Sequence, residues 1–228
     1  MKVSLKTITP NAEVNIVEIA RVSSSRQDKT ENPEGLINYL IKNKHWSPFE
    51  HSHLTFEVVS SKSIGIQLLR HVSFRFQEFS QRYAKVEKVE PIEFRWQAEK
   101  NRQSSTDAIA TMEQLENGEF LGVPADILDI SEEMISWLVE TSFALEKIMA
   151  QYNKGIELGI AKECVRMILP MATQTTIYMT GNIRSWIHFL DVRDDGHAQK
   201  EVQEIAKEIK GLFIKELPII SKALNYIA

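Results

Sequence analysis

Apolar residues recur along this chain with two different periods, and segments of the two kinds alternate. Loose alternation and clusters of β-branched residues predict strands at residues 1–8, 54–59, 83–96 and 173–180, the third interrupted at Pro91. Apolar residues three and four apart predict helices at residues 33–43, 60–73, 131–155, 159–169, 183–192 and 198–217, with a short helix after them. This mixture predicts an α+β fold.

Several of these helices carry signals at their ends. Asn32 can accept a hydrogen bond from the first helical turn and Pro33 suits the first helical position, so we expect a helix to begin there. Ser131 is placed to cap the long helix in the same way. Gly155 is expected to end that long helix, because glycine is the usual residue just after a helix C-terminus.

Three stretches lack a clear period and are expected to be irregular. They are residues 24–32, 45–51 and 101–130. The last of them is polar and contains Gly and Pro, which predicts a variable surface excursion with a short helix near Ala108–Leu115. The chain as a whole is expected to form a single domain over residues 1–228.

Composition fits one globular domain and excludes several classes of protein. The 228 residues are 43% hydrophobic and 25% charged, as is usual for a domain with a substantial core. The formal net charge of −4 lacks the basic field of a dedicated nucleic-acid binder. No apolar run approaches the roughly 20 residues that span a bilayer, and the N-terminus lacks a signal-peptide core. One cysteine, Cys164, excludes an internal disulfide, and a cytoplasmic location is expected.

Residues 70–83 concentrate side chains that suit an anionic, flat ligand. Three arginines lie there among aromatic residues, together with a histidine, a glutamate and two serines. Guanidinium groups match phosphate oxygens two at a time, and short polar side chains can read the edges of a heterocycle. The alternative interpretation is a helix end followed by an edge strand with ordinary surface ion pairs.

The histidines do not predict a metal site. His51 and His53 are two apart and His45 is near, but the H-E-x-x-H spacing and a convergent carboxylate pair are lacking. Neither a G-x-G-x-x-G nor a G-x-x-x-x-G-K-[ST] run is present, so a Rossmann or P-loop nucleotide site has no support.

The order of residues in 70–83 resembles the signature of the flavin-dependent thymidylate synthases, also called thymidylate synthase complementing proteins. Arg70-His71 is followed after eight residues by Ser-x-Arg-Tyr at residues 80–83. Three positions depart from the family's usual form. Val72 stands where the family usually has a second arginine, Gln77 replaces a frequent Asn, and Gln81 replaces a frequent Gly.

Three further blocks resemble the same family in the same order. They are Ser-Pro-Phe-Glu-His at 47–51 with Leu-Thr-Phe at 54–56, a glycine followed by Glu-x-x-Arg-x-x-Leu-Pro within 159–170, and Asn-x-Arg-Ser through His-Ala-Gln within 182–199. Each block also has an ordinary structural interpretation. These are a Pro-led turn, a local ion pair between Glu163 and Arg166 on one helix, and an amphipathic helix.

The resemblance implies a compact α+β domain with a central antiparallel-rich sheet flanked by helices, assembled as a homotetramer with flavin sites between subunits. It implies methylation of dUMP at C5 to dTMP, with methylenetetrahydrofolate as carbon donor and tetrahydrofolate released. NADPH would reduce FAD, and the reduced flavin would supply the hydride. No metal and no nucleic-acid or membrane partner is implied.

The resemblance also implies site residues. The dUMP site would comprise Gln67, Arg70, Glu78, Ser80, Arg82, Arg166 and Arg193. The FAD site would comprise His51, Thr55, Arg70, His71, Gln77, Glu78, Asn182, Arg184, His188 and His197. Arg193 and Ser80 are the candidate catalytic residues. Arg193 would stabilise charge developing on the uracil, and Ser80 is interpreted as a hydrogen-bonding ligand because no adjacent base would activate it as a nucleophile.

Other functions remain open from the sequence. The chain could be a variant flavin-dependent enzyme that makes another modified pyrimidine, such as a hydroxymethyl nucleotide. It could also be a nucleic-acid-binding module that uses the arginine cluster, or an assembly protein without a cofactor. Flavin absorbance in the purified protein would discriminate the last two from an enzyme.

Overall fold

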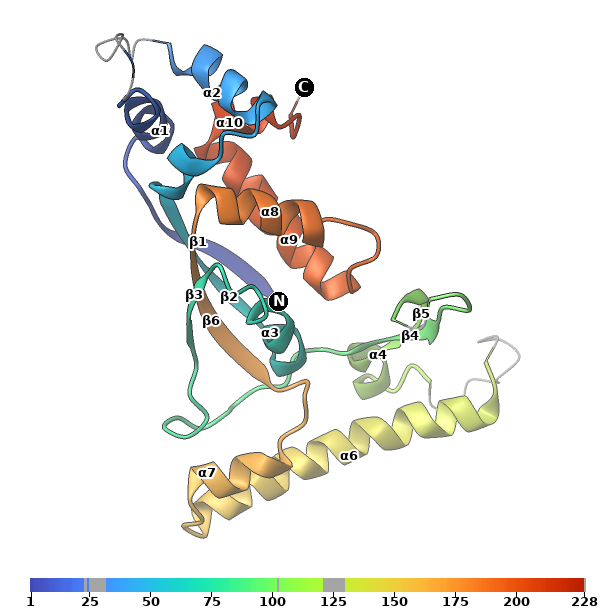
Figure 1. Cartoon of the computed structure of the whole chain (residues 1–228). Coiled ribbons are helices and arrows are strands. Elements are labelled where there is room, and N and C mark those ends of the chain that lie inside the picture. The colour runs from blue at the N-terminus through green and yellow to red at the C-terminus, as the bar shows by residue number, and fades with distance from the viewer. Residues whose placement is uncertain (23, 25–31, 102, 121–129, 228) are drawn as a thin grey trace. The chain divides into compact units, whose positions relative to one another are not determined.

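The structure is a computed structural model that describes residues 1–22, 24, 32–101, 103–120 and 130–227 (Figure 1). The chain divides into two compact units. The first comprises Met1–Ser60, Ile64–Glu78 and Thr176–Ala228, and the second comprises Ser61–Ser63 and Phe79–Thr175. None of the helices in the described ranges is long and apolar enough to cross a membrane.

A four-stranded sheet forms the centre of the first unit. Its strands lie in the order β1 (Lys2–Ile8), β2 (His53–Ser61), β6 (Gln174–Asn182) and β3 (Arg75–Glu78). β1 pairs with β2 and β3 with β6 in antiparallel register. Backbone hydrogen bonds from Ile183 to Ser52 and from Lys62 to Thr173 join opposite ends of β2 and β6, which therefore also run antiparallel. The predicted antiparallel sheet flanked by helices is confirmed.

Helices cover this sheet and bury its apolar side chains. They are α1 (Ala12–Ala20), α2 (Pro33–Lys42), the 3-10 helix η1 (Ser47–Glu50), α3 (Lys62–Leu68), α8 (Ile183–Arg193), α9 (Lys200–Glu216) and α10 (Pro218–Ala223). Trp186 of α8 is fully buried at the sheet. Its indole N–H donates to the Leu54 carbonyl at 3.2 Å, and its ring meets Phe56 edge-on at 4.8 Å. These contacts fix α8 against β2.

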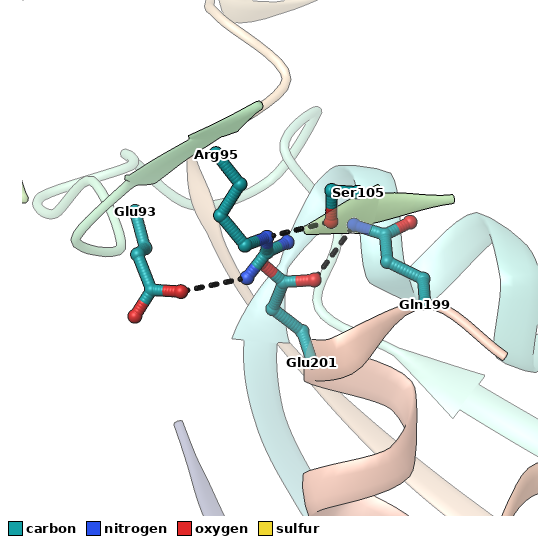
Figure 2. A network of polar contacts seen from close by, with 5 residues as sticks. All are labelled: Glu93, Arg95, Ser105, Gln199 and Glu201. Atoms are coloured by element: carbon teal, nitrogen blue, oxygen red, sulfur yellow. Dashed lines mark hydrogen bonds and ion pairs between the residues drawn. The ribbon is translucent and has the colours of Figure 1, made fainter. Parts of the chain in front are cut away.

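The second unit contains a two-stranded sheet and a long helix. Its elements are β4 (Glu93–Gln97), β5 (Ser105–Thr111), α4 (Met112–Glu116), α6 (Glu132–Glu157), α7 (Lys162–Val165) and the 3-10 helix η2 (Arg166–Ile168). Figure 2 shows Arg95 on β4, which donates to Glu93 at 3.1 Å and to the Ser105 hydroxyl of β5 at 2.9 Å. The buried Tyr152 of α6 accepts a hydrogen bond from the Val86 amide at 3.0 Å.

The helix starts predicted from capping residues are confirmed. The Asn32 side chain accepts from the Glu34 amide and Ser131 accepts from the Met134 amide. The predicted end of the long helix at Gly155 is wrong. α6 continues to Glu157, and the glycine that follows its end with a left-handed backbone (φ +81) is Gly159.

Several predicted elements differ from the structure. The helix predicted for 159–169 is only the short α7 followed by η2, which together span 162–168, and the stretch 45–51, expected to be irregular, contains η1. The helix predicted for 60–73 ends at Leu68, so Arg70 and His71 follow it. The strand predicted for 83–96 is β4 alone, preceded by irregular chain and an isolated bridge at Val89. The excursion predicted for 101–130 contains β5 and α4, so Ala108 is in a strand and the helix begins four residues later. Most of residues 24–32 and residues 121–129 lie outside the described ranges.

Candidate active site

Three of the predicted flavin-site residues lie at one cavity of the first unit. Asn182 is the residue that caps α8, and Arg184 and His188 lie within that helix. The cavity has a volume of about 700 Å³. Its walls are formed by Lys44, Trp46, Glu50, Ser73, Asn182, Arg184, Ser185, Ile187, His188 and Asp191.

The sequence of α8 determines which side chains reach this cavity. The Asn182 side-chain oxygen accepts from the Ser185 amide at 2.8 Å and so fixes the first turn of the helix. Trp186, Phe189 and neighbouring apolar residues are buried on one side. Arg184 and His188 are four residues apart and exposed, so they share the opposite face.

The cavity is lined by both positive and negative residues, and each negative side chain already has an ion-pair or hydrogen-bond partner. The Glu50 carboxylate of η1 forms an ion pair with the Arg184 guanidinium. The Asp191 carboxylate accepts from the Tyr226 hydroxyl at 3.0 Å. Burial raises the pKa of Tyr226, and Asp191 raises it further, so this phenol stays protonated at neutral pH.

These properties fit part of a flavin cofactor. Ligand cavities in proteins are usually about 300–1,000 Å³, mostly apolar, with a few polar groups that orient the ligand. Trp46 and Ile187 provide apolar wall, while Lys44 and Arg184 provide positive charge for an anionic group. Lys44, Trp46, Glu50, Ser73 and Asp191 were not predicted as site residues from the sequence. Glu50, Ser73 and Asp191 lie inside blocks that carried a signal.

A second constellation in the same unit joins His71 to Arg193. Arg193, the last residue of α8, donates from Nε to His71 Nε2 at 2.9 Å. The His71 ring meets Phe189 edge-on at 5.0 Å and Phe74 at 6.2 Å. Burial lowers the pKa of His71 to about 4, with further contributions from Arg193 and His188. His71 is therefore neutral at pH 7 and holds its proton on Nδ1 while Nε2 orients the arginine.

The lowered pKa predicts a pH-dependent contribution of His71 to stability. Between pH 4 and 6.5 the unfolded chain binds the proton more strongly than the folded protein, so the free energy of unfolding should rise with pH in that window. The contribution is complete above about pH 6.5 and stays below about 3 kcal/mol, because solvent screens the half-buried ring. Denaturation of the parent and of His71→Gln at several pH values measures it. A stability difference between the two proteins that is constant from pH 4 to 7 would contradict the assignment.

Several predicted residues of the first unit lie in other contacts. Gln67 of α3 donates to the Gln199 side chain at 2.6 Å, and Gln199 donates to Glu201 at 2.8 Å, the bond drawn in Figure 2. The hydroxyl groups of Thr55 and Thr180 lie 2.9 Å apart across β2 and β6.

The remaining predicted residues of this unit are at element ends or on β3. Gln77 and Glu78 are on β3, which pairs with β6. His51 follows η1, and His197 lies in a turn in which its amide donates to Asp195 at 2.8 Å. Val72, one of the three departures from the family signature, is 87% exposed and contributes no core packing.

The predicted residues Ser80, Arg82 and Arg166 belong to the second unit. Arg82 forms an ion pair with Glu163 at 3.2 Å, and both side chains line a small cavity of about 190 Å³ together with Tyr83. Glu163 thus has a partner other than the Arg166 expected from helical spacing. Both side chains are more than half exposed, so the pair contributes at most about 1 kcal/mol and can open for a ligand.

Comparison with known proteins assigns the family. The family model described as thymidylate synthase complementing protein matches residues 4–219. The chain is 43% identical to a probable flavin-dependent thymidylate synthase of Paramecium bursaria Chlorella virus 1, over 95% of this chain and 92% of that protein. It is 39% identical to the flavin-dependent thymidylate synthase of Synechocystis, over 92% and 88% of the two chains.

A solved structure shares the fold. It is the UMP/dUMP methylase PolB of Streptomyces cacaoi bound with 5-Br dUMP, with a TM-score of 0.76 and 25% sequence identity over 99% of this chain and 95% of that one. Two independent kinds of likeness therefore extend over nearly the whole sequence. The chain belongs to the thymidylate synthase complementing protein family.

Proposed function

We propose that this protein is a flavin-dependent thymidylate synthase that methylates dUMP at C5 to give dTMP. Methylenetetrahydrofolate donates the carbon, NADPH is the reductant, and tetrahydrofolate leaves. The observation that carries the proposal is the joint occurrence of two features. The chain matches relatives of that name over more than nine-tenths of its length, and three residues of its family signature line one cavity with positive charge.

The proposed roles follow from the chemistry of the side chains. When bound, the FAD supplies a hydride. His51, Thr55, Arg70, His71, Gln77, Glu78, Asn182, Arg184, His188 and His197 are the residues proposed to bind it. The guanidinium and imidazole groups among them can meet phosphate and ring heteroatoms, and Trp46 adds an apolar surface to the cavity.

The nucleotide would be bound by Gln67, Arg70, Glu78, Ser80, Arg82, Arg166 and Arg193. Arg193 is the proposed catalytic cation, because attack by C5 requires negative charge to develop on the uracil ring and a fixed cation stabilises it. Its hydrogen bond to neutral His71 supports this role, since the bond holds the guanidinium without neutralising its charge.

The purified protein provides the first test. Absorbance of a bound flavin, followed by dTMP formation from dUMP, methylenetetrahydrofolate and NADPH, is the expected result. Omission of each component in turn should abolish the product. A colourless protein that does not take up added FAD, or a salt-sensitive binder of nucleic acid without methylation activity, would reject the proposal.

A second substrate belongs in the same assay because of the structural relative, which acts on UMP as well as dUMP. The two substrates differ only by the ribose 2′-hydroxyl. A site with a donor or acceptor at that position would accept UMP, and a site closed there by apolar groups would reject it. The ratio of kcat/KM values for dUMP and UMP measures this preference.

Ser80→Ala distinguishes a ligand from a nucleophile. As a hydrogen-bonding ligand Ser80 should contribute roughly 0.5–1.5 kcal/mol, so the variant should keep measurable dTMP formation with a few-fold to tenfold lower kcat/KM. Its carbonyl accepts from the Tyr83 and Ala84 amides, which the substitution leaves intact. Complete loss of turnover in a folded, flavin-loaded variant would instead support covalent catalysis by Ser80.

We also propose a homotetramer of single-domain subunits in the cytoplasm, with FAD bound at subunit contacts. The exposed large apolar side chains of the second unit are candidates for contacts between subunits, because a contiguous apolar patch marks an interaction surface. Trp137, Phe143 and Met167 are 53%, 59% and 79% exposed. Light scattering during size-exclusion chromatography should give four times the subunit mass of 26.2 kDa. A monomeric mass in an active, flavin-loaded sample would reject this assembly.

A further inference from the structure

Lys44 occupies a backbone position at which glycine is the usual residue. It follows the end of α2 with a left-handed conformation, φ 57°. The His45 amide donates to the Leu40 carbonyl at 2.8 Å and the Lys44 amide to the Ile41 carbonyl at 3.0 Å. These two bonds form a Schellman motif with Lys44 at the residue where the absence of a Cβ is normally favoured.

The local structure gives lysine no evident advantage at this position. The other described non-glycine residues with positive φ are Asn11 and Asn225, and asparagine tolerates this conformation better than other L-residues do. Lys42 already places a cation in the last turn of α2, near the negative end of the helix dipole. Throughout the described part of the chain, no carboxylate lies within ion-pair distance of the Lys44 ammonium.

Lys44 is one of the residues that line the same cavity as Arg184 and His188. The other charged groups at that cavity have partners. Arg184 forms an ion pair with Glu50, and Asp191 accepts a hydrogen bond from the Tyr226 hydroxyl. Lys44 therefore contributes positive charge that no described carboxylate neutralises, in a cavity with an aromatic wall from Trp46, two residues further along the chain. An ammonium group in this setting is suited to bind a phosphate.

We propose that Lys44 binds a phosphate group of the flavin cofactor in this cavity. The inference rests on the proposed function, because it assumes that FAD is the occupant. It adds a residue outside the four sequence blocks, and it explains why a strained turn carries a long cation. The flavin phosphate would offset the unfavourable backbone conformation only in the loaded protein.

Lys44→Gly separates the two effects of the residue. The variant loses the cation and relieves the backbone, so the flavin-free protein should melt about 2–4 °C higher than the parent. The same variant should bind FAD about tenfold more weakly, as expected for loss of one charge-assisted hydrogen bond near the surface. Riboflavin, which lacks phosphate, should bind the variant and the parent equally. Lys42→Ala removes a neighbouring cation outside the cavity. It should change neither the affinity for FAD nor the affinity for riboflavin.

Each outcome decides a different point. An unchanged FAD dissociation constant in Lys44→Gly, with the higher melting temperature, would overturn the proposal and leave the proposed function intact. Equal losses of affinity for FAD and riboflavin would also overturn it, because the contact would not be to phosphate. Lys44→Asn, which tolerates the turn and lacks the charge, should repeat the selective loss for FAD. A parent protein that binds no flavin would reject the proposed function itself.

Discussion

Arg193→Ala should lower kcat for dTMP formation by about 10²- to 10³-fold and leave KM for dUMP nearly unchanged. The expected asymmetry follows from when the interaction is strongest. Charge on the uracil grows as C5 attacks the one-carbon unit, so a cation that meets this charge stabilises the transition state more than the bound substrate. An enzyme with normal kcat and only a raised KM would show that Arg193 binds the ground state.

The structure supplies matched variants for this measurement. Arg193→Lys keeps a positive charge but lacks the Nε–H that donates to His71 at 2.9 Å, so it should recover only part of the lost kcat. Lys207→Ala removes an exposed cation of α9 and should leave kcat unchanged. An equal loss in Arg193→Lys and Arg193→Ala would indicate that the planar guanidinium, rather than charge alone, is required.

Local signals were sufficient for most of the helices and for three strands. Asn32 and Ser131 accept hydrogen bonds within the first turn, and this bond depends only on residues two or three positions away. The alternation in β2 is equally local, because every second residue from Leu54 onward is buried against helices. Such features can be recognised without knowing what lies across the sheet.

The errors occur where distant contacts decide the structure. β3 has only four residues and is held by its pairing with β6, about one hundred residues further along the chain, so periodicity does not reveal it. Gly155 lies inside α6, and a Cβ there would lie 3.1 Å from a Val165 methyl group, so this glycine serves close packing and does not end the helix. The sequence alone does not distinguish this packing glycine from Gly159, which ends the helix.

The candidate site likewise combines residues that local sequence signals predicted with residues that only the fold brings to them. The family-like block at 182–199 predicted Asn182, Arg184 and His188 together, and one helix places them at one cavity. Lys44 and Trp46 reach that cavity from a segment about 140 residues earlier, and no spacing rule connects the two segments. The bond between His71 and Arg193 likewise joins two blocks that the sequence identified separately.

Gly181→Ala should destabilise the first unit by about 1–3 kcal/mol, which corresponds to a melting temperature lower by roughly 3–10 °C. Gly181 is buried in β6 beside the ring of Phe74. A Cβ at this position would lie 2.4 Å from two carbons of that ring, a distance that requires a shift of the neighbour. Phe74 is only 3% exposed and meets the Trp186 ring at 4.6 Å, so little space is available for such a shift.

The consequence should extend to the candidate active site, because Phe74 also lies edge-on against His71 at 6.2 Å. Displacement of the Phe74 ring would disturb the imidazole that orients Arg193, so Gly181→Ala should lower kcat at temperatures where the protein is still folded. Gly211→Ala is the matched control. Gly211 is exposed within α9, and a methyl group added there would have no neighbouring atom within 4 Å, so alanine should stabilise the helix by about 1 kcal/mol. A Gly181→Ala protein as stable as the parent, measured by thermal denaturation beside this control, would show that Phe74 can move aside and that the aromatic packing does not fix His71.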